Sequence, residues 1–165
     1  MKNLLASATS ARPGFGSNLP PVAARLLEEA VAARGQPNRA DAILWSAQAM
    51  YPDCLAIYFA LYKFYFYEGK LHEAERTTRL GLARAARLAG FAPDWYTLTP
   101  ASADWSDTRG PQHFYLFSLK ALAFMCLRLG RRPESQAILS KLAQLDPADS
   151  IGASVIRDLA SGSLE

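Results

Sequence analysis

The stretch that decides the fold runs from Leu55 to Leu88 and reads LAIYFALYKFYFYEGKLHEAERTTRLGLARAARL. Apolar residues recur in it at three- and four-residue spacings, which is the period of an amphipathic helix. Gly69 interrupts the pattern where the end of a helix often requires a left-handed residue. The stretch therefore predicts two helices, over 54–68 and 71–90, joined by a tight turn.

The same layout occurs on both sides of this stretch. Gly35 and Gly69 stand 34 positions apart, and the segments around them, 21–54 and 55–88, align without a gap. A third segment, 116–149, places Gly130 and Pro147 in the matching positions. A single helix pair cannot bury its own apolar face, so the three units are expected to stack on one another.

The period and the residue pattern resemble the tetratricopeptide repeat. The second unit matches the family's pattern at Tyr58, Leu61, Tyr65, Ala74 and Gly81, and Pro52 and Pro147 close the first and third units. The first unit departs from it, with Ala24 and Val31 where the family has aromatic residues, and the third unit has Leu119 and Cys126 there. The resemblance implies an all-α fold, a right-handed array of antiparallel helix pairs (a TPR-like α-solenoid).

We expect one domain of about seven helices over 20–160, between a flexible tail at 1–19 and a short tail at 161–165. The expected helices are 20–34, 38–50, 54–68, 71–90, 112–129, 133–145 and a capping helix at 148–160. Asn38 is a suitable N-cap for the second of them. Ala74 and Gly81 are predicted to lie where the two helices of the second unit cross.

An insert at 89–115, rich in proline and containing Trp95 and Trp105, breaks the period. Loops longer than about 12–15 residues are uncommon and are often functional. Two interpretations stay open. The insert is either an irregular connector whose tryptophans pack against the helices, or a lid or docking segment that contacts a partner through them.

The composition argues against several classes of protein. The net charge is only +3 and the basic residues are scattered, which disfavours nucleic acid as a partner, and the arginines of 76–87 are interpreted as a solvated helix face. The apolar runs are too short for a membrane span, and the run from Leu4 to Ala6 is too short for a signal peptide. These features predict a cytoplasmic protein that does not enter a membrane.

The sequence offers no convergent set of catalytic groups. His72, His113, Cys54 and Cys126 include no pair at the short spacing of a zinc site. A nucleophile elbow and a glycine-rich phosphate loop are both missing from the chain. We therefore expect a protein that is not an enzyme and that carries no cofactor and no metal.

The resemblance also implies a concave groove lined by the first helix of each unit. The groove residues that it assigns are mostly aromatic or basic: Arg25, Phe59, Lys63, Phe66, Tyr67, Phe117, Lys120, Phe124 and Arg128. Helix 54–68 is apolar all round, and such a helix is buried on most sides. A lid, a second copy, a partner or the insert itself should therefore cover its groove side. Some family members clamp a terminal carboxylate, but here Glu29 stands where that clamp needs an asparagine.

The leading hypothesis is a protein-interaction module, adaptor or chaperone-like, that binds an apolar and partly acidic protein or peptide segment in this groove. The segment belongs either to another protein or to the chain's own Asp94–Trp105 stretch. A homodimer that buries its own apolar faces is the alternative. An RNA-associated helical repeat is a third hypothesis, which the scattered basic residues disfavour.

Overall fold

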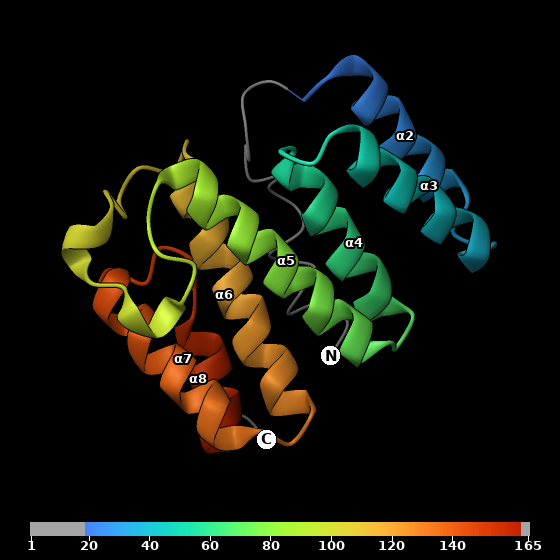
Figure 1. Ribbon diagram of the computed structural model, residues 1–165. Helices are drawn as coiled ribbons and strands as arrows, with labels where there is room; N and C mark the ends of the chain where they lie inside the picture. The colour runs from blue at the N-terminus through green and yellow to red at the C-terminus, as the bar shows by residue number, and fades with distance from the viewer. Residues whose placement is uncertain (1–18, 163–165) are drawn as a thin grey trace.

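A computed structural model describes residues 19–162, and within this range the chain is helical and contains no strand. The helices are α2 (Pro21–Ala32), α3 (Pro37–Met50), α4 (Leu55–Tyr67), α5 (Leu71–Ala89), α6 (Pro111–Arg128), α7 (Arg132–Leu145) and α8 (Ser154–Ser161), with two short 3-10 helices, η1 (Trp95–Thr97) and η2 (Pro100–Ser102) (Figure 1). The all-α class is thus confirmed. The predicted tails lie almost wholly outside the described residues.

Single residues mark several helix ends. Gly69 and Gly130 follow α4 and α6 with φ of 73° and 78°, a left-handed conformation that costs glycine little. Pro37 and Pro111 begin α3 and α6 at the first helical position, where the N–H that proline lacks would have no partner within the helix. Such local signals help to explain why six of the seven predicted helices agree with the observed bounds to within two residues at both ends.

One predicted N-cap and one predicted helix start are wrong. Gln36, not Asn38, occupies the N-cap of α3, and it makes no side-chain capping bond. The last helix begins at Ser154 rather than at 148, because Asp149 adopts a φ of 53° and its carboxylate accepts the backbone N–H of Ser154 at 3.1 Å. Such a bond between a side chain and the backbone stabilises a non-helical turn, and the helix therefore begins later.

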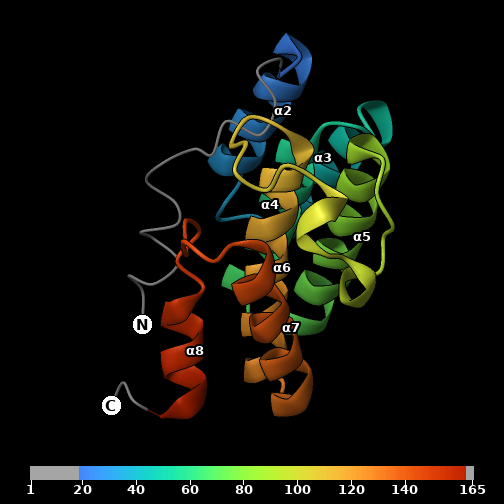
Figure 2. The ribbon, with the colours of Figure 1, turned by 90° about the vertical axis from the view of Figure 1, so that its left-hand side faces the viewer.

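The helices pack in chain order, each against the next, from α2 to α7, and α8 packs on α7. The even-numbered helices also contact one another in sequence: α2 with α4, α4 with α6, and α6 with α8. Figure 2 shows α5 and the insert on one side of α6 and α8 on the other. One side of α6 is therefore bounded by the insert, whereas its other side is bounded by α8.

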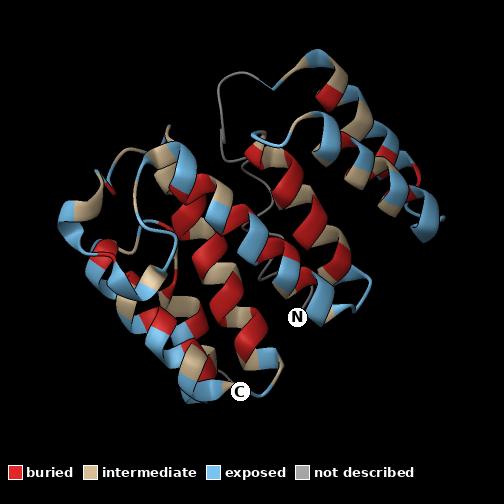
Figure 3. Ribbon diagram, viewed as in Figure 1, coloured by how far each residue is buried: buried red, intermediate tan, exposed pale blue. Residues whose placement is uncertain are grey.

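The core is centred on α4, α5 and α6 (Figure 3). Phe114 and Tyr58, which are 0% and 2% exposed, meet across α5 at Gly81. A Cβ atom at Gly81 would lie 3.0 Å from Tyr58 Cβ and 3.2 Å from Phe114 Cζ. The structure thus places Gly81 at the predicted crossing of α4 and α5, and adds that α6 reaches the same point.

The insert packs against α6 and α7. Trp105 is 7% exposed, its ring centroid lies 5.3 Å from that of Phe91, and its Nε1 donates a hydrogen bond to the Thr99 carbonyl at 3.1 Å. Lys141 of α7 donates to the carbonyl of Leu98 at 2.7 Å. Trp95 is half-buried beside the same core. Both tryptophans therefore pack within the chain, as the connector interpretation expected.

A helix that spans a membrane is long and predominantly apolar. None of the helices in 19–162 combines enough length with enough apolar character to cross a bilayer.

Candidate partner-binding surface

Helix α4 carries the first of the predicted partner-binding residues as a cation–aromatic pair. The Lys63 ammonium lies 5.0 Å from the centroid of the Phe59 ring, because residues four apart share one face of a helix. Both side chains are half-buried. Burial lowers the pKa of Lys63, and the nearby positive charge of Arg34 lowers it further. Among residues 19–162, no carboxylate lies within ion-pair distance of this ammonium.

Helix α6 repeats the arrangement twice. The Lys120 ammonium lies 4.9 Å from the Phe117 ring centroid, and the Arg128 guanidinium lies 5.9 Å from that of Phe124. Each pair is worth about 0.5–1 kcal/mol where it is exposed to water. Together with the pair on α4, they place three cations over aromatic rings.

An aromatic contact joins the two helices. The ring centroids of Phe66 in α4 and Phe124 in α6 are 5.6 Å apart, and Tyr67 meets Phe66 edge to face at 6.1 Å. Tyr67 is 59% exposed, which is unusual for so large a ring on an apolar helix. The helical spacing of three and four residues places the cation–aromatic pairs on the same sides of α4 and α6 as this contact. We call the set the aromatic–basic face: Phe59, Lys63, Phe66 and Tyr67 of α4, with Phe117, Lys120, Phe124 and Arg128 of α6.

Lys120 has a role within the chain that the sequence did not reveal. Its ammonium donates a hydrogen bond to the carbonyl of Ile151 at 2.5 Å, in the turn that precedes α8. Burial lowers the pKa of Lys120, although the charge of Asp149 opposes this effect. The lysine therefore ties the turn before α8 to α6 by a hydrogen bond. Its charge is less available to a partner than the sequence suggested.

Arg25 and the two tryptophans do not join the aromatic–basic face. Arg25 is exposed on α2, and within 19–162 no hydrogen bond or ion pair links it to the face. Trp105 contacts Tyr115, which precedes Phe117 by two residues and so lies about 200° around α6 from it. The hypothesis that the Asp94–Trp105 stretch fills this face is therefore wrong: the stretch packs on another side of α6.

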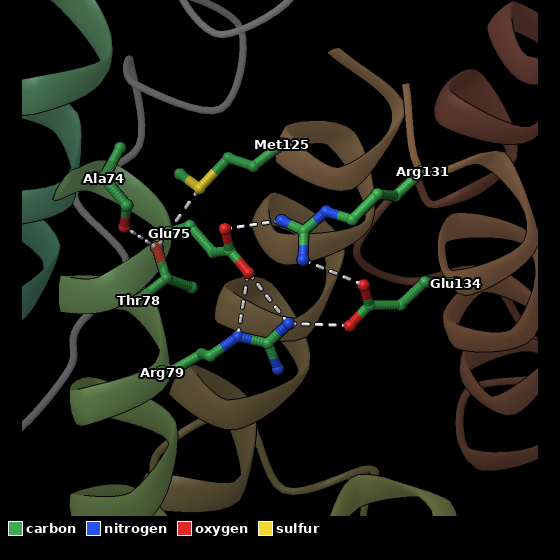
Figure 4. A network of polar contacts seen from close by, with 7 residues as sticks. All are labelled: Ala74, Glu75, Thr78, Arg79, Met125, Arg131 and Glu134. Carbon is green, nitrogen blue, oxygen red and sulfur yellow. Dashed lines mark hydrogen bonds and ion pairs between the residues drawn. The ribbon is translucent and has the colours of Figure 1, made fainter. Parts of the chain in front are cut away.

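The largest polar cluster in the described part of the chain was missed from the sequence. Glu75 and Arg79 of α5, Arg131 of the turn after α6 and Glu134 of α7 form a closed ring of alternating charges (Figure 4). The four nitrogen–oxygen distances are 2.9 Å for Glu75–Arg79, 2.6 Å for Arg79–Glu134, 3.1 Å for Glu134–Arg131 and 2.5 Å for Arg131–Glu75. The pairing of Glu75 with Arg79, four residues on, is readable in the sequence, but its partners 55 residues away are not.

Hydrogen bonds in this ring set the charge state of Glu75. Its side chain is 12% exposed, and burial alone would raise its pKa. Hydrogen bonds from Arg131 and Arg79 outweigh that effect and hold the pKa of Glu75 below its ordinary value. The ring is thus an ion-paired tie between α5 and α7, with each arginine bound to both carboxylates.

Residues 19–162 contain no cluster of histidine, cysteine, aspartate or glutamate side chains arranged to hold a metal ion. The two cysteines in this range are free thiols, Cys54 half-buried and Cys126 buried. Burial, followed by the charge of Glu134, raises the pKa of Cys126 to about 11. Such a thiol is protonated at neutral pH and is a poor nucleophile.

The chain matches none of the known protein-family models. No solved structure matches it either. It is similar to a protein of Azotobacter chroococcum mcd 1, described as the uncharacterized 19.8 kDa protein in nifW 5'region. The two are 31% identical over 122 residues, which cover 73% of this chain and 68% of the relative. The chain belongs to the same family as this Azotobacter protein.

Proposed function

We propose that the chain is a right-handed, tetratricopeptide-like array of helix pairs that acts as a protein-interaction module. Its aromatic–basic face holds an apolar, partly acidic segment of another protein, in the manner of an adaptor or a chaperone. The observation that carries the proposal is the Phe66–Phe124 contact between α4 and α6, flanked by the exposed ring of Tyr67. Aromatic residues grouped in this way are typical of the energetic centre of protein interfaces.

The cations beside these rings support the same proposal. Lys63 lies over the Phe59 ring of α4 and Arg128 over the Phe124 ring of α6, and such basic side chains would steer an acidic segment. The chain's own Asp94–Trp105 stretch packs elsewhere, with Trp105 against Phe91 and Tyr115, so it does not compete for the face. A partner from another molecule is therefore the occupant that the geometry favours.

The test is selection from a random peptide library on the intact protein, followed by affinity measurement with two variants. Tyr67→Ala with Phe124→Ala removes two rings of the face. Tyr96→Ala removes an equally exposed ring, 62% accessible, from η1 of the insert and serves as the matched control. We expect the selected peptides to combine apolar and acidic residues, and to lose at least about tenfold in affinity only with the double variant.

Two results would contradict the proposal. One is that the library yields no peptide that binds. The other is that the selected peptides bind the double variant and the control with equal affinity. Light scattering over a range of concentrations completes the test, since a dimer that the double variant abolishes would assign the face to a second copy of the chain instead.

A further inference from the structure

The cations of the aromatic–basic face differ in what satisfies their charge. Lys120 donates to the Ile151 carbonyl, and Arg128 is exposed to water. Lys63 is half-buried, and the part of the chain that the structure describes supplies neither an ion pair nor a hydrogen-bond acceptor for it. An ammonium group has three N–H donors, and burying a charge without a partner is unfavourable.

A second cation makes this position still more positive. Arg34 lies in the turn between α2 and α3, close enough for its charge to act on Lys63. The Phe59 ring fixes the ammonium in place, so little side-chain freedom is lost when an anion binds there. Glu68, at the C-cap of α4, is the nearest carboxylate along the chain, yet it forms no ion pair with Lys63. The local charge is therefore unbalanced on the side of the face next to α2.

We propose that a side-chain carboxylate of the bound segment docks on Lys63, with Arg34 as the second cation, while an apolar residue of the same segment docks on Phe66, Tyr67 and Phe124. This assignment rests on the proposed function and adds the position of the acidic residue to it. We assign the segment to another protein, as in the proposed function. Residues 1–18 of this chain contain Lys2 and Arg12 but no aspartate or glutamate, and so offer no side-chain carboxylate for Lys63.

The arrangement also predicts the spacing of the two anchors. Lys63 lies on the side of α4 influenced by the α2–α3 turn, whereas Phe124 lies on α6, the next helix across the face. Packed helices are 8–10 Å apart, and an extended chain advances about 3.4 Å per residue, so the acidic and apolar anchors should be about three residues apart. A segment that crosses α4 and α6 in an extended form meets both anchors at once.

The probes are fluorescent peptides with an amidated C-terminus in a glycine–serine background. Each carries one aspartate and one phenylalanine, one to six residues apart and in both orders, and each has a twin with asparagine in place of aspartate. Amidation, together with a dye that carries no acidic group, leaves the side-chain carboxylate as the only anion. Binding to the intact protein is followed by fluorescence polarisation. We expect the aspartate peptides with a separation near three to bind about tenfold more tightly than their asparagine twins.

Lys63→Gln should remove that preference while leaving the asparagine peptides bound as before, and Lys63→Arg should restore it. Lys70→Gln, an exposed lysine at the N-cap of α5, is the matched control and should change nothing. The melting temperature of Lys63→Gln should equal or exceed that of the wild type, since the substitution removes a half-buried charge that Arg34 repels. A clear fall in melting temperature would point to a structural role instead.

The failure of this inference can be told from the failure of the proposed function. If aspartate and asparagine peptides bind equally well, the face binds peptides but Lys63 does not receive a carboxylate, and the inference is overturned. If the preference for aspartate survives Lys63→Gln, the anion docks elsewhere and the inference is equally overturned. If no peptide binds at any separation, the result contradicts both the proposed function and this inference.

Discussion

The first helix pair, α2 with α3, and the next two pairs, α4 to α7, are built with very different side chains. The buried residues of the first pair are mostly alanines, at 23, 30, 40 and 47, with Leu44 as the largest of them. The buried residues of α4 and α6 include Tyr58, Tyr62, Phe114 and Tyr115. Hydrophobic stabilisation grows with the apolar area removed from water, so helix pairs of similar length contribute unequally to stability.

The junctions between the pairs differ as well. The first pair meets α4 through tyrosine hydroxyls: Trp45 Nε1 donates to Tyr65 at 2.7 Å, Tyr65 donates to Asp41, and Gln48 donates to Tyr58 at 3.1 Å. The second and third pairs meet through apolar rings and the four-charge ring of Figure 4. Tyr58 and Tyr65 of α4 therefore place their rings in the core and turn their hydroxyls to α3.

The largest effect should follow from removing a ring at the centre of the molecule. Phe114→Ala deletes a side chain that is 0% exposed and should lower the free energy of unfolding by about 3–5 kcal/mol. Leu44→Ala, its counterpart in the first pair, should cost about 2 kcal/mol, since its alanine surroundings give it less to pack against. Urea unfolding measures both, and equal losses would show that the two regions are equally well packed.

A smaller effect should follow from overfilling a helix crossing. Ala74→Leu, at a position that is 0% exposed in α5, should cost roughly 1–3 kcal/mol because α4 and α6 confine it. Ala40→Leu, at the corresponding place in α3 and 1% exposed, should cost less because the first pair can shift relative to α4. Thermal unfolding compares the two variants. A melting temperature unchanged by Ala74→Leu would mean that the predicted repeat register is wrong.

The smallest effect concerns the ring of charges, which joins only the second and third pairs. Glu75→Gln should cost roughly 1 kcal/mol at neutral pH. Because the pKa of Glu75 is lower in the folded state, its contribution is complete above the ordinary value of 4.5 and is lost as the pH falls through the folded pKa. Wild type and variant should therefore converge in stability below about pH 4.5. A difference that persists to the lowest pH would exclude ionisation of Glu75 as its cause.

Helix ends that depend on one residue could be predicted from the sequence. Gly69, Gly130 and Pro111 act through their own backbone geometry, so the turn after α4, the turn after α6 and the start of α6 needed no knowledge of tertiary structure. The aromatic and basic character of the face on α4 and α6 also followed from helical spacing. The position of Gly81 at a crossing followed from its match to the repeat pattern.

Features that depend on distant partners could not be predicted in this way. The sequence predicts Lys120 as a cation of the groove. In the folded chain its ammonium group donates to the carbonyl of Ile151, 31 residues on. The start of α8 depends on the Asp149 carboxylate, which accepts the backbone N–H of Ser154 in place of a helical carbonyl. Arg79 was interpreted as part of a solvated face, because Glu134 lies 55 residues away in the sequence.

Gly81 has a consequence for how this family can vary. The atoms that stand 3.0 and 3.2 Å from the place of its missing Cβ belong to Tyr58 and Phe114, on two different helices. A relative with alanine at this position must therefore carry a smaller residue opposite it, or hold α4 and α6 farther from α5. Substitutions at 81 and 114 should consequently occur together over the history of the family, and position 58 should follow them less closely, because its Cβ belongs to every residue except glycine.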